Sequence, residues 1–125
     1  MTETTHELGF ESSILQSILN GQKTVEGRLA KGKFLRFNIG DKILLREDIW
    51  KNGEIIGSKQ TDRTAKITVI KQYRSFEEML KSEGIASVVP SAQSMHEALR
   101  MYYQFYSRED EGKHGVIAFE VSVNS

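Results

Sequence analysis

The chain has 125 residues, of which 38% are apolar, with one proline and no cysteine. This composition predicts a single domain over residues 1–125 with its own core, and it excludes disulfides, thiolate metal sites and thiol nucleophiles. Seventeen basic and seventeen acidic side chains cancel, which argues against a protein that binds duplex DNA through a large positive surface.

The first ten residues, MTETTHELGF, contain neither an apolar signal core nor a membrane-spanning segment, so we expect a cytoplasmic protein that does not interact with membranes. The following stretch, FESSILQSILNG, repeats apolar residues at helical spacing. We expect a helix that Ser12 or Ser13 caps and that Gly21 ends in a left-handed conformation. Lys23 would then follow directly after the first helix.

The segment TVEGRL is typical of a short strand. Period-two alternation places three polar side chains on one face, namely Thr24, Glu26 and Arg28. Gly27 leaves room for the close approach of another backbone or a ligand. Between residues 23 and 46, seven basic side chains face only two acidic ones, so this region is locally basic. It suits a short phosphate-bearing ligand, but an ordinary solvated surface has the same composition.

The remaining elements alternate between strand and helix patterns. KILLRE and RTAKITVIKQY predict strands, and the glycine-containing residues 51–62 between them predict a hairpin. SFEEMLKSEG carries a capping box and predicts a helix that ends at Gly84, and SAQSMHEALRMYYQFYS predicts a second helix. The charged run from Ser107 to Lys113 is typical of a solvated loop, or of a mobile gate, before the final strand GVIAFEVSV. This order predicts an α+β domain whose sheet curls into a small barrel.

One motif carries a resemblance. GQKTVEGRL resembles the G-x-K-x-x-E-x-R signature of the ASCH family, the activating-signal-cointegrator homology domain, and GDKILL, YRSFEEMLKSEG and YYQFYSREDEGKHGVIAFEV resemble its later blocks. The resemblance extends over nearly the whole chain from about Leu8. It implies a PUA-like small β-barrel with helices packed around it and a cleft lined by the signature residues.

The same resemblance implies RNA binding. Some small members are similar to amidohydrolases that remove the acetyl group from N4-acetylcytidine, and others have been proposed to cut RNA. The family's cleft lysine falls on Lys23, its acidic position on Glu26 and its arginine on Arg28. The deacetylating members have threonine where this chain has Glu26. In this chain the hydroxyl of the neighbouring Thr24 would take the place of that threonine. Their further catalytic glutamate aligns with Glu83.

The residues support a ligand site independently of the family. A lysine and an arginine beside a carboxylate offer donors to a phosphate or carbonyl oxygen and an acceptor to the amino group of a cytosine-like base. Tyr73, Tyr103 and Tyr106 are candidates for stacking on an unpaired base, although tyrosines at helical spacing are also typical of core packing, Tyr102 and Tyr103 above all.

Two alternatives stay open from the sequence. Lys23, Glu26 and Arg28 could instead form a partly buried ion-pair network that joins the first helix to the barrel. If they form a site, recognition of RNA or a nucleoside is favoured, and hydrolysis that uses Lys23, Thr24, Glu26 and Glu83 is the alternative. The scattered histidines predict no metal site, and no sequence fingerprint indicates a cofactor.

Overall fold

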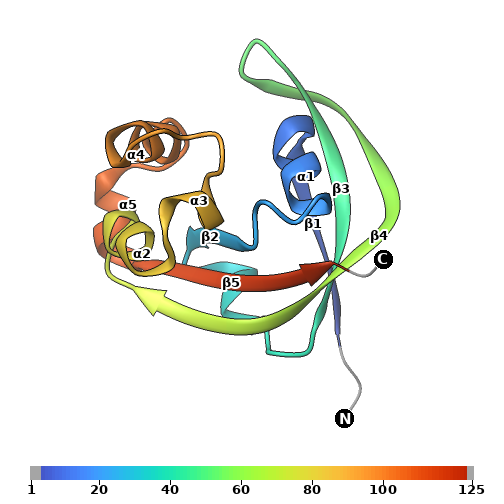
Figure 1. Ribbon diagram of the computed structural model, residues 1–125, viewed down its shortest axis with the longest axis horizontal. Helices are drawn as coiled ribbons and strands as arrows, with labels where there is room; N and C mark the ends of the chain where they lie inside the picture. The colour runs from blue at the N-terminus through green and yellow to red at the C-terminus, as the bar shows by residue number, and fades with distance from the viewer. Residues whose placement is uncertain (1–3, 124–125) are drawn as a thin grey trace.

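The computed structural model describes residues 4–123, and its strands form one strongly curved sheet in the order β1-β3-β4-β5-β2 (Figure 1). The strands are β1 (Thr5–Glu11), β2 (Val25–Leu29), β3 (Lys42–Lys51), β4 (Glu54–Tyr73) and β5 (Val116–Val123). β1 runs parallel to β3, whereas the other pairs are antiparallel. The α+β class with a barrel-like sheet is therefore confirmed, with β1 and β2 as the two edges of an open sheet.

The helices separate into two groups. They are α1 (Ser12–Leu19), the 3-10 helix η1 (Gly32–Arg36), α2 (Phe76–Glu83), α3 (Ile85–Val88), α4 (Met95–Tyr103) and α5 (Arg108–His114). Figure 1 shows α1 beside β1 and β3, whereas α2 to α5 gather at the opposite end of the sheet, around β2 and the start of β5. Among the described helices, none combines the length and the apolar character that crossing a membrane requires.

The helix starts test the capping predictions. The capping box of α2 is confirmed, because the Ser75 hydroxyl oxygen accepts from the Glu78 N–H at 3.0 Å. The expected serine cap of α1 is wrong: the cap is Glu11, whose carboxylate accepts from the Ser13 N–H at 3.2 Å. The Ser12 hydroxyl donates to Glu47 instead. The helix begins one residue earlier than expected, at Ser12, so the capping position falls on Glu11.

The charged run from Ser107 to Lys113 is also corrected. It is neither a solvated loop nor a gate, because Arg108–His114 form α5. The Ser107 hydroxyl oxygen caps this helix by accepting from the Asp110 N–H at 3.0 Å. Glu111 is buried, and its carboxylate accepts from the Phe76 N–H at 2.8 Å. A run of charges is thus helical here because one of its carboxylates bonds inside the domain.

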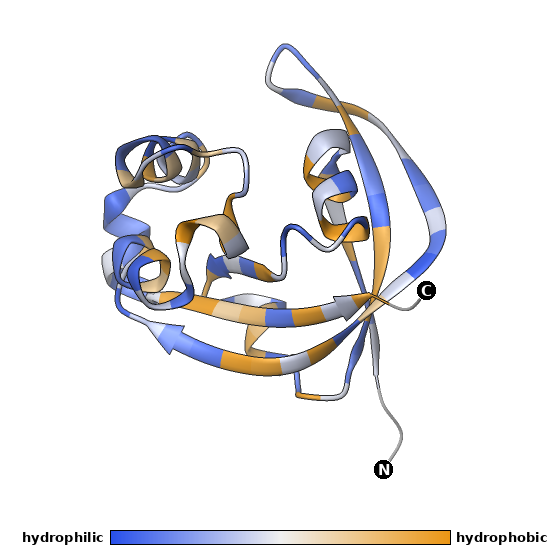
Figure 2. Cartoon of the chain, viewed as in Figure 1, coloured by the Kyte–Doolittle hydropathy of each residue, from blue (hydrophilic) through white to orange (hydrophobic). Residues whose placement is uncertain are grey.

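Two apolar cores hold the sheet and helices together. One core joins the inner face of the sheet to α1 and includes Leu8, Leu45 and Phe119. The other joins β2 and the start of β5 to the group of α2, α3 and α4 and includes Phe76 and Met79. Figure 2 shows the apolar bands along β5 and on the sides of the helices that face it. β2 lies at the boundary between the two cores.

The β3–β4 hairpin is the most exposed part of the sheet. Its two-residue turn consists of Asn52 and Gly53, both with positive φ, as the expected hairpin requires. Figure 1 shows this hairpin extending beyond the rest of the sheet on the side where α4 lies. Large apolar side chains are exposed along it, namely Ile49, Trp50, Ile55 and Ile56. The hairpin therefore presents apolar surface that neither core covers.

Candidate functional site

Lys23 lies between the end of α1 and β2, and its ammonium group is buried, with 6% of the residue exposed. Nζ donates to the backbone oxygens of Val25, at 2.9 Å, and of Val88 at the end of α3. It also lies 3.6 Å from Oε1 of Glu26. Burial lowers the pKa of Lys23, the Glu26 charge opposes that effect, and the Arg28 charge adds to it. Because three acceptors surround its three protons, Lys23 holds α3 against β2.

Glu26 is the acidic centre of the group. Its Oε1 accepts from the Gly27 N–H at 3.0 Å, and its Oε2 lies 3.5 Å from a terminal nitrogen of Arg28. Both ion pairs are longer than the 2.7–2.9 Å typical of a charge-assisted hydrogen bond. The carboxylate is buried, with 11% of its side chain exposed. A carboxylate that uses only part of its acceptor capacity keeps lone pairs for a further donor.

Arg28 is held between two aromatic rings. Its Cζ lies 5.6 Å from the ring centre of Phe10 and 5.5 Å from that of Phe34. Burial lowers the pKa of Arg28, but the charges of Glu26, Tyr106 and Tyr102 outweigh it and raise the pKa overall. A guanidinium has five N–H donors, and within residues 4–123 its only acceptor contact is the 3.5 Å approach to Glu26. With 23% of its side chain exposed, Arg28 offers fixed and largely unused donors.

Two tyrosines face this charged group. The pKa of Tyr102 is raised by burial first and then by the Glu26 charge, whereas Arg28 lowers it. Burial also raises the pKa of Tyr106. The Arg28 charge lowers that pKa and the Glu26 charge raises it. Both rings stack on Phe76, at 4.3 and 5.2 Å between ring centres. Tyr102 and Tyr106 thus pack on Phe76 within the electrostatic influence of Glu26 and Arg28, and stacking of Tyr106 on a base stays a prediction.

Tyr102 is a neighbour that sequence reasoning missed, because we assigned it to the core. It packs in the core through Phe76, but its hydroxyl reaches the motif: a Cβ placed on Gly27 would lie 3.1 Å from that oxygen. The same Cβ would lie 2.5 Å from Sδ of Met79. The close approach expected at Gly27 is therefore made by side chains. The spacing of Tyr102 and Tyr106, four residues apart, is the signal that pointed to a shared face.

Glu83 and Tyr73 form a separate pair. The Tyr73 hydroxyl donates to the Glu83 carboxylate, and it lies 3.1 Å from the Ser82 hydroxyl. Burial, followed by the hydrogen bond to Glu83, raises the pKa of Tyr73. The charged neighbours that act on the pKa of Lys23 are Glu26 and Arg28. The structure therefore groups Lys23, Glu26 and Arg28 and pairs Glu83 with Tyr73.

Thr24 and Tyr103 take part mainly in structural contacts. The Thr24 N–H donates to the Ser87 oxygen at 2.9 Å, and its carbonyl oxygen accepts from the Val121 N–H at 2.9 Å. The Tyr103 hydroxyl lies 2.8 and 3.0 Å from the two carboxylate oxygens of Glu111. Thr24 thus fixes the backbone next to Lys23, and Tyr103 joins α4 to α5.

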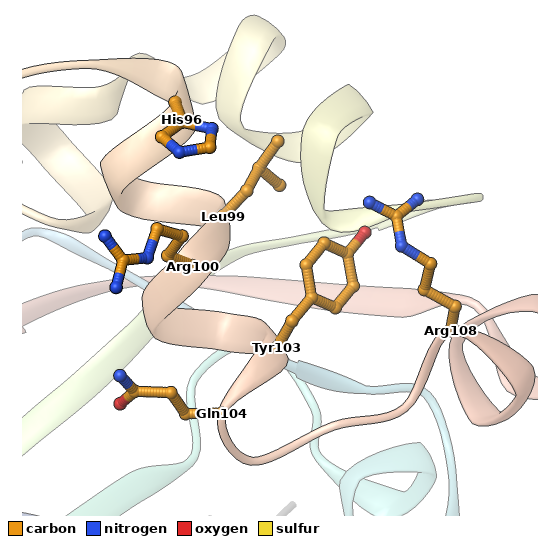
Figure 3. Close-up of a pocket in the computed structure, with 6 residues that line it drawn as sticks. All are labelled: His96, Leu99, Arg100, Tyr103, Gln104 and Arg108. Atoms are coloured by element: carbon orange, nitrogen blue, oxygen red, sulfur yellow. The ribbon is translucent and has the colours of Figure 1, made fainter.

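A surface hollow of about 310 Å³ lies elsewhere, along α4 and the start of α5 (Figure 3). Its lining residues are His96, Leu99, Arg100, Tyr103, Gln104 and Arg108. Burial, followed by the hydrogen bond to Glu111, raises the pKa of Tyr103 to about 12. Among residues 4–123, the structure contains no group of three His, Asp or Glu side chains that could hold a metal ion.

The comparison with protein families decides what kind of domain this is. The model of the ASCH domain matches residues 8–124. The chain belongs to the ASCH domain family. The match includes the buried group of Lys23, Glu26 and Arg28 on both sides of the start of β2. No curated protein matches this ASCH chain.

Solved structures support the same fold. The hypothetical protein PH0355 is 33% identical, with a TM-score of 0.81, over 97% of this chain and 100% of that chain. PF0455 from Pyrococcus furiosus is 31% identical, with a TM-score of 0.74, over 96% and 97% of the two chains. A mutant of ZmASCH from Zymomonas mobilis is 16% identical, with a TM-score of 0.58, over 96% of this chain and 68% of that chain. At that identity ZmASCH supports the fold alone.

Proposed function

We propose that this ASCH domain recognises an unpaired nucleobase and its sugar-phosphate, in RNA or in a modified nucleoside, at Glu26 and Arg28. The observation that carries the proposal is the state of Arg28. Its guanidinium is held between the rings of Phe10 and Phe34 and keeps most of its N–H donors free. A guanidinium that is fixed in place loses little entropy when it binds a carbonyl or phosphate oxygen.

Glu26 supplies the acceptor that selects the base. A carboxylate accepts from the amino group of cytosine, whereas uracil presents an oxygen at the corresponding position. The two ion contacts of Glu26, at 3.6 Å to Lys23 and 3.5 Å to Arg28, place two cations beside the carboxylate without using up its lone pairs. We therefore expect cytidine to bind more tightly than uridine.

Lys23 positions this acceptor. Its ammonium group donates to two backbone oxygens and lies beside Glu26, so it fixes α3 and the carboxylate together. The sequence left open whether Lys23, Glu26 and Arg28 form an ion-pair network or a ligand site. In this proposal they form both, because the ion-pair network around Lys23 supports the recognition site. The Tyr102 hydroxyl lies beside Gly27 of the motif, and Tyr106 stacks on Tyr102 and Phe76.

The test is calorimetric binding of cytidine 5′-monophosphate, uridine 5′-monophosphate and N4-acetylcytidine. Arg28→Lys keeps the charge but removes the planar fork, so we expect affinity for both nucleotides to fall about 10-fold or more. Glu26→Gln should reduce the preference for cytidine over uridine. Arg36→Lys, in the exposed end of η1, is the matched control and should bind as the wild type does. Equal binding by wild type and Arg28→Lys would contradict the proposal.

Amide hydrolysis is the second candidate, and one observation favours it. Lys23 has a lowered pKa and lies 3.6 Å from a carboxylate, an arrangement that suits proton transfer during attack of water on an acyl group. The roles expected for Glu83 and Thr24 remain predictions, and the bond from Tyr73 to Glu83 makes Glu26 the better candidate base. Cleavage of RNA at the same group is a related alternative.

Chromatography for cytidine and acetate after incubation with N4-acetylcytidine tests this candidate. Release that is lost in Glu26→Gln and retained in Glu83→Ala would assign hydrolysis to the buried group. Release that is lost in Glu83→Ala would assign it to the position that aligns with the deacetylating relatives. Binding without release supports recognition alone.

A further inference from the structure

Two exposed aromatic rings meet between the hairpin and the helices. Trp50 of β3 and Phe105, which follows α4, have ring centres 5.9 Å apart at an interplanar angle of 63°. Trp50 is 39% exposed and Phe105 is 66% exposed. This contact joins two parts of the chain that are far apart in the sequence. The open ring faces give an unpaired base a place to stack.

The hollow along α4 is lined by Gln104, and the next residue in the sequence is Phe105. Arg100 and Gln104 lie one helical turn apart on α4, and Arg108 enters from α5 (Figure 3). The Arg108 guanidinium packs 4.5 Å from the ring centre of Tyr103. Within residues 4–123, neither arginine forms an ion pair. Two uncompensated guanidinium groups at a hollow complement a phosphate.

Among residues 4–123, no acidic side chain belongs to the lining of the hollow. Glu111 is buried and accepts from the Tyr103 hydroxyl and the Phe76 N–H. Glu97 accepts from the Gln93 N–H at the start of α4. Both carboxylates are thus engaged within the domain. The arginines remain the groups that a ligand in the hollow would meet.

We propose that Trp50, Phe105, Arg100, Gln104 and Arg108 form one binding surface, the α4–hairpin surface, for a single-stranded RNA segment that continues from the base bound at Glu26 and Arg28. This inference rests on the proposed function. Phe105 is exposed, and the next residue, Tyr106, stacks on Phe76 and on Tyr102, whose hydroxyl lies against Gly27 of the motif. The turn between α4 and α5 therefore joins the two sites. The ligand class is an oligonucleotide, whose second base stacks on Trp50 and Phe105 and whose phosphate binds the arginines.

Trp50 is the one tryptophan of the chain, so its fluorescence reports on this surface directly. The experiment titrates the protein with a cytidine RNA hexamer and, separately, with cytidine 5′-monophosphate. We expect the hexamer to quench Trp50 emission and to bind more tightly than the mononucleotide. Phe105→Ala should weaken hexamer binding by roughly 5- to 100-fold, because a stacked base is lost. The affinity for the mononucleotide should stay at the wild-type value.

The arginines are tested by salt dependence. For single strands the slope of log affinity against log salt changes by about 0.7 for each phosphate contact. Arg100→Gln/Arg108→Gln should therefore reduce the slope for the hexamer. The control Lys66→Gln/Lys71→Gln removes the same charge from exposed positions on β4 and should leave the slope near that of the wild type.

The outcomes separate this inference from the proposed function. Hexamer binding that is unchanged in both Phe105→Ala and the double arginine variant overturns the α4–hairpin surface, even if Arg28→Lys weakens mononucleotide binding. Mononucleotide binding that is insensitive to Arg28→Lys overturns the proposed site instead. If Trp50→Ala abolishes self-association of the protein in sedimentation and leaves hexamer affinity unchanged, the surface is a contact between copies and the inference is wrong.

Discussion

The guanidinium of Arg28 on β2 lies 5.6 Å from the ring centre of Phe10 on β1. These strands are the two edges of the sheet, so a side-chain contact joins the edges where the backbone ladder is open. The most unusual charged group of the domain therefore lies at the seam of its barrel. A polar group at such a seam reaches solvent without breaking a strand pair, which suits a recognition site on a rigid support.

The support role of Lys23 predicts a large loss of stability when its charge is removed. Lys23→Met leaves the Val25 and Val88 oxygens without the Nζ donor, and Glu26 keeps its contact with Arg28. We expect the free energy of unfolding to fall by about 3–5 kcal/mol in urea denaturation, because one partner of a buried ion pair is removed and two backbone oxygens lose their donor. The double variant Lys23→Met/Glu26→Gln should lose less than the sum of the single changes. Strict additivity would show that the two residues do not act as a pair.

Gly27→Ala should destabilise the domain and disturb the site. The added Cβ would lie 2.5 Å from Sδ of Met79 and 3.1 Å from the Tyr102 hydroxyl, and Met79 is fully buried. Overpacking of this kind costs about 1–3 kcal/mol, which thermal unfolding measures as a lower Tm. Gly57→Ala is the matched control, because its Cβ would meet only Ile49 Cδ1, at 3.9 Å. Equal Tm changes for both variants would contradict the close packing around Gly27.

Asp41 predicts a loss of stability in acid. The hydrogen bond with His6, at 2.8 Å, lowers the pKa of Asp41; burial opposes this, and the Asn38 and Thr4 N–H groups assist it. The pKa of this carboxyl is thus lower in the folded state than its unfolded value of about 3.9. Its contribution is complete above the unfolded value and is lost as the pH falls through the folded one.

Asp41→Asn should therefore lower the free energy of unfolding at neutral pH by about 1–3 kcal/mol, and the difference from wild type should shrink toward about pH 3. Urea denaturation at both pH values provides the measurement. Asp62→Asn changes an exposed carboxylate on β4 and should show little effect at either pH. A difference for Asp41→Asn that is constant with pH would exclude the carboxylate as its source.

The four tyrosines predict behaviour in alkali. Burial raises the pKa of Tyr73, Tyr102, Tyr103 and Tyr106, that of Tyr103 to about 12. Phenolate absorbance of the folded protein should therefore rise only well above pH 10, whereas the urea-unfolded chain should titrate at about 10. Because the folded values are raised, the stability from neutral tyrosines is complete below the unfolded value and is lost as the pH rises through the folded values. Tyr103→Phe should remove the part of the phenolate titration near pH 12. Tyrosines of the folded protein that titrate at about 10 would contradict their burial.

Local sequence patterns predicted much of this ASCH domain because their causes are local. Ser75 and Glu78 define the start of α2, alternation defines β4 and β5, and two glycines mark the hairpin. Alternation in the short strand after α1 also predicted that Glu26 and Arg28 share one face, and the end of α1 placed Lys23 just before that strand. The capping of α5 by Ser107 is equally local. We did not predict this helix because the charged residues that follow Ser107 are also typical of a loop.

Only the tertiary structure decided the contacts between distant segments. The sequence did not indicate that residues 5–11 pair in parallel with β3, because a parallel partner leaves no turn signal between the strands. It did not indicate that Glu83 pairs with Tyr73 or that the Tyr102 hydroxyl lies beside Gly27, because periodicity assigns a face but not what that face meets. Spacing along the chain is set by backbone geometry, whereas the seam at Arg28 and Phe10 exists only once the sheet has curled and its two edges have come together.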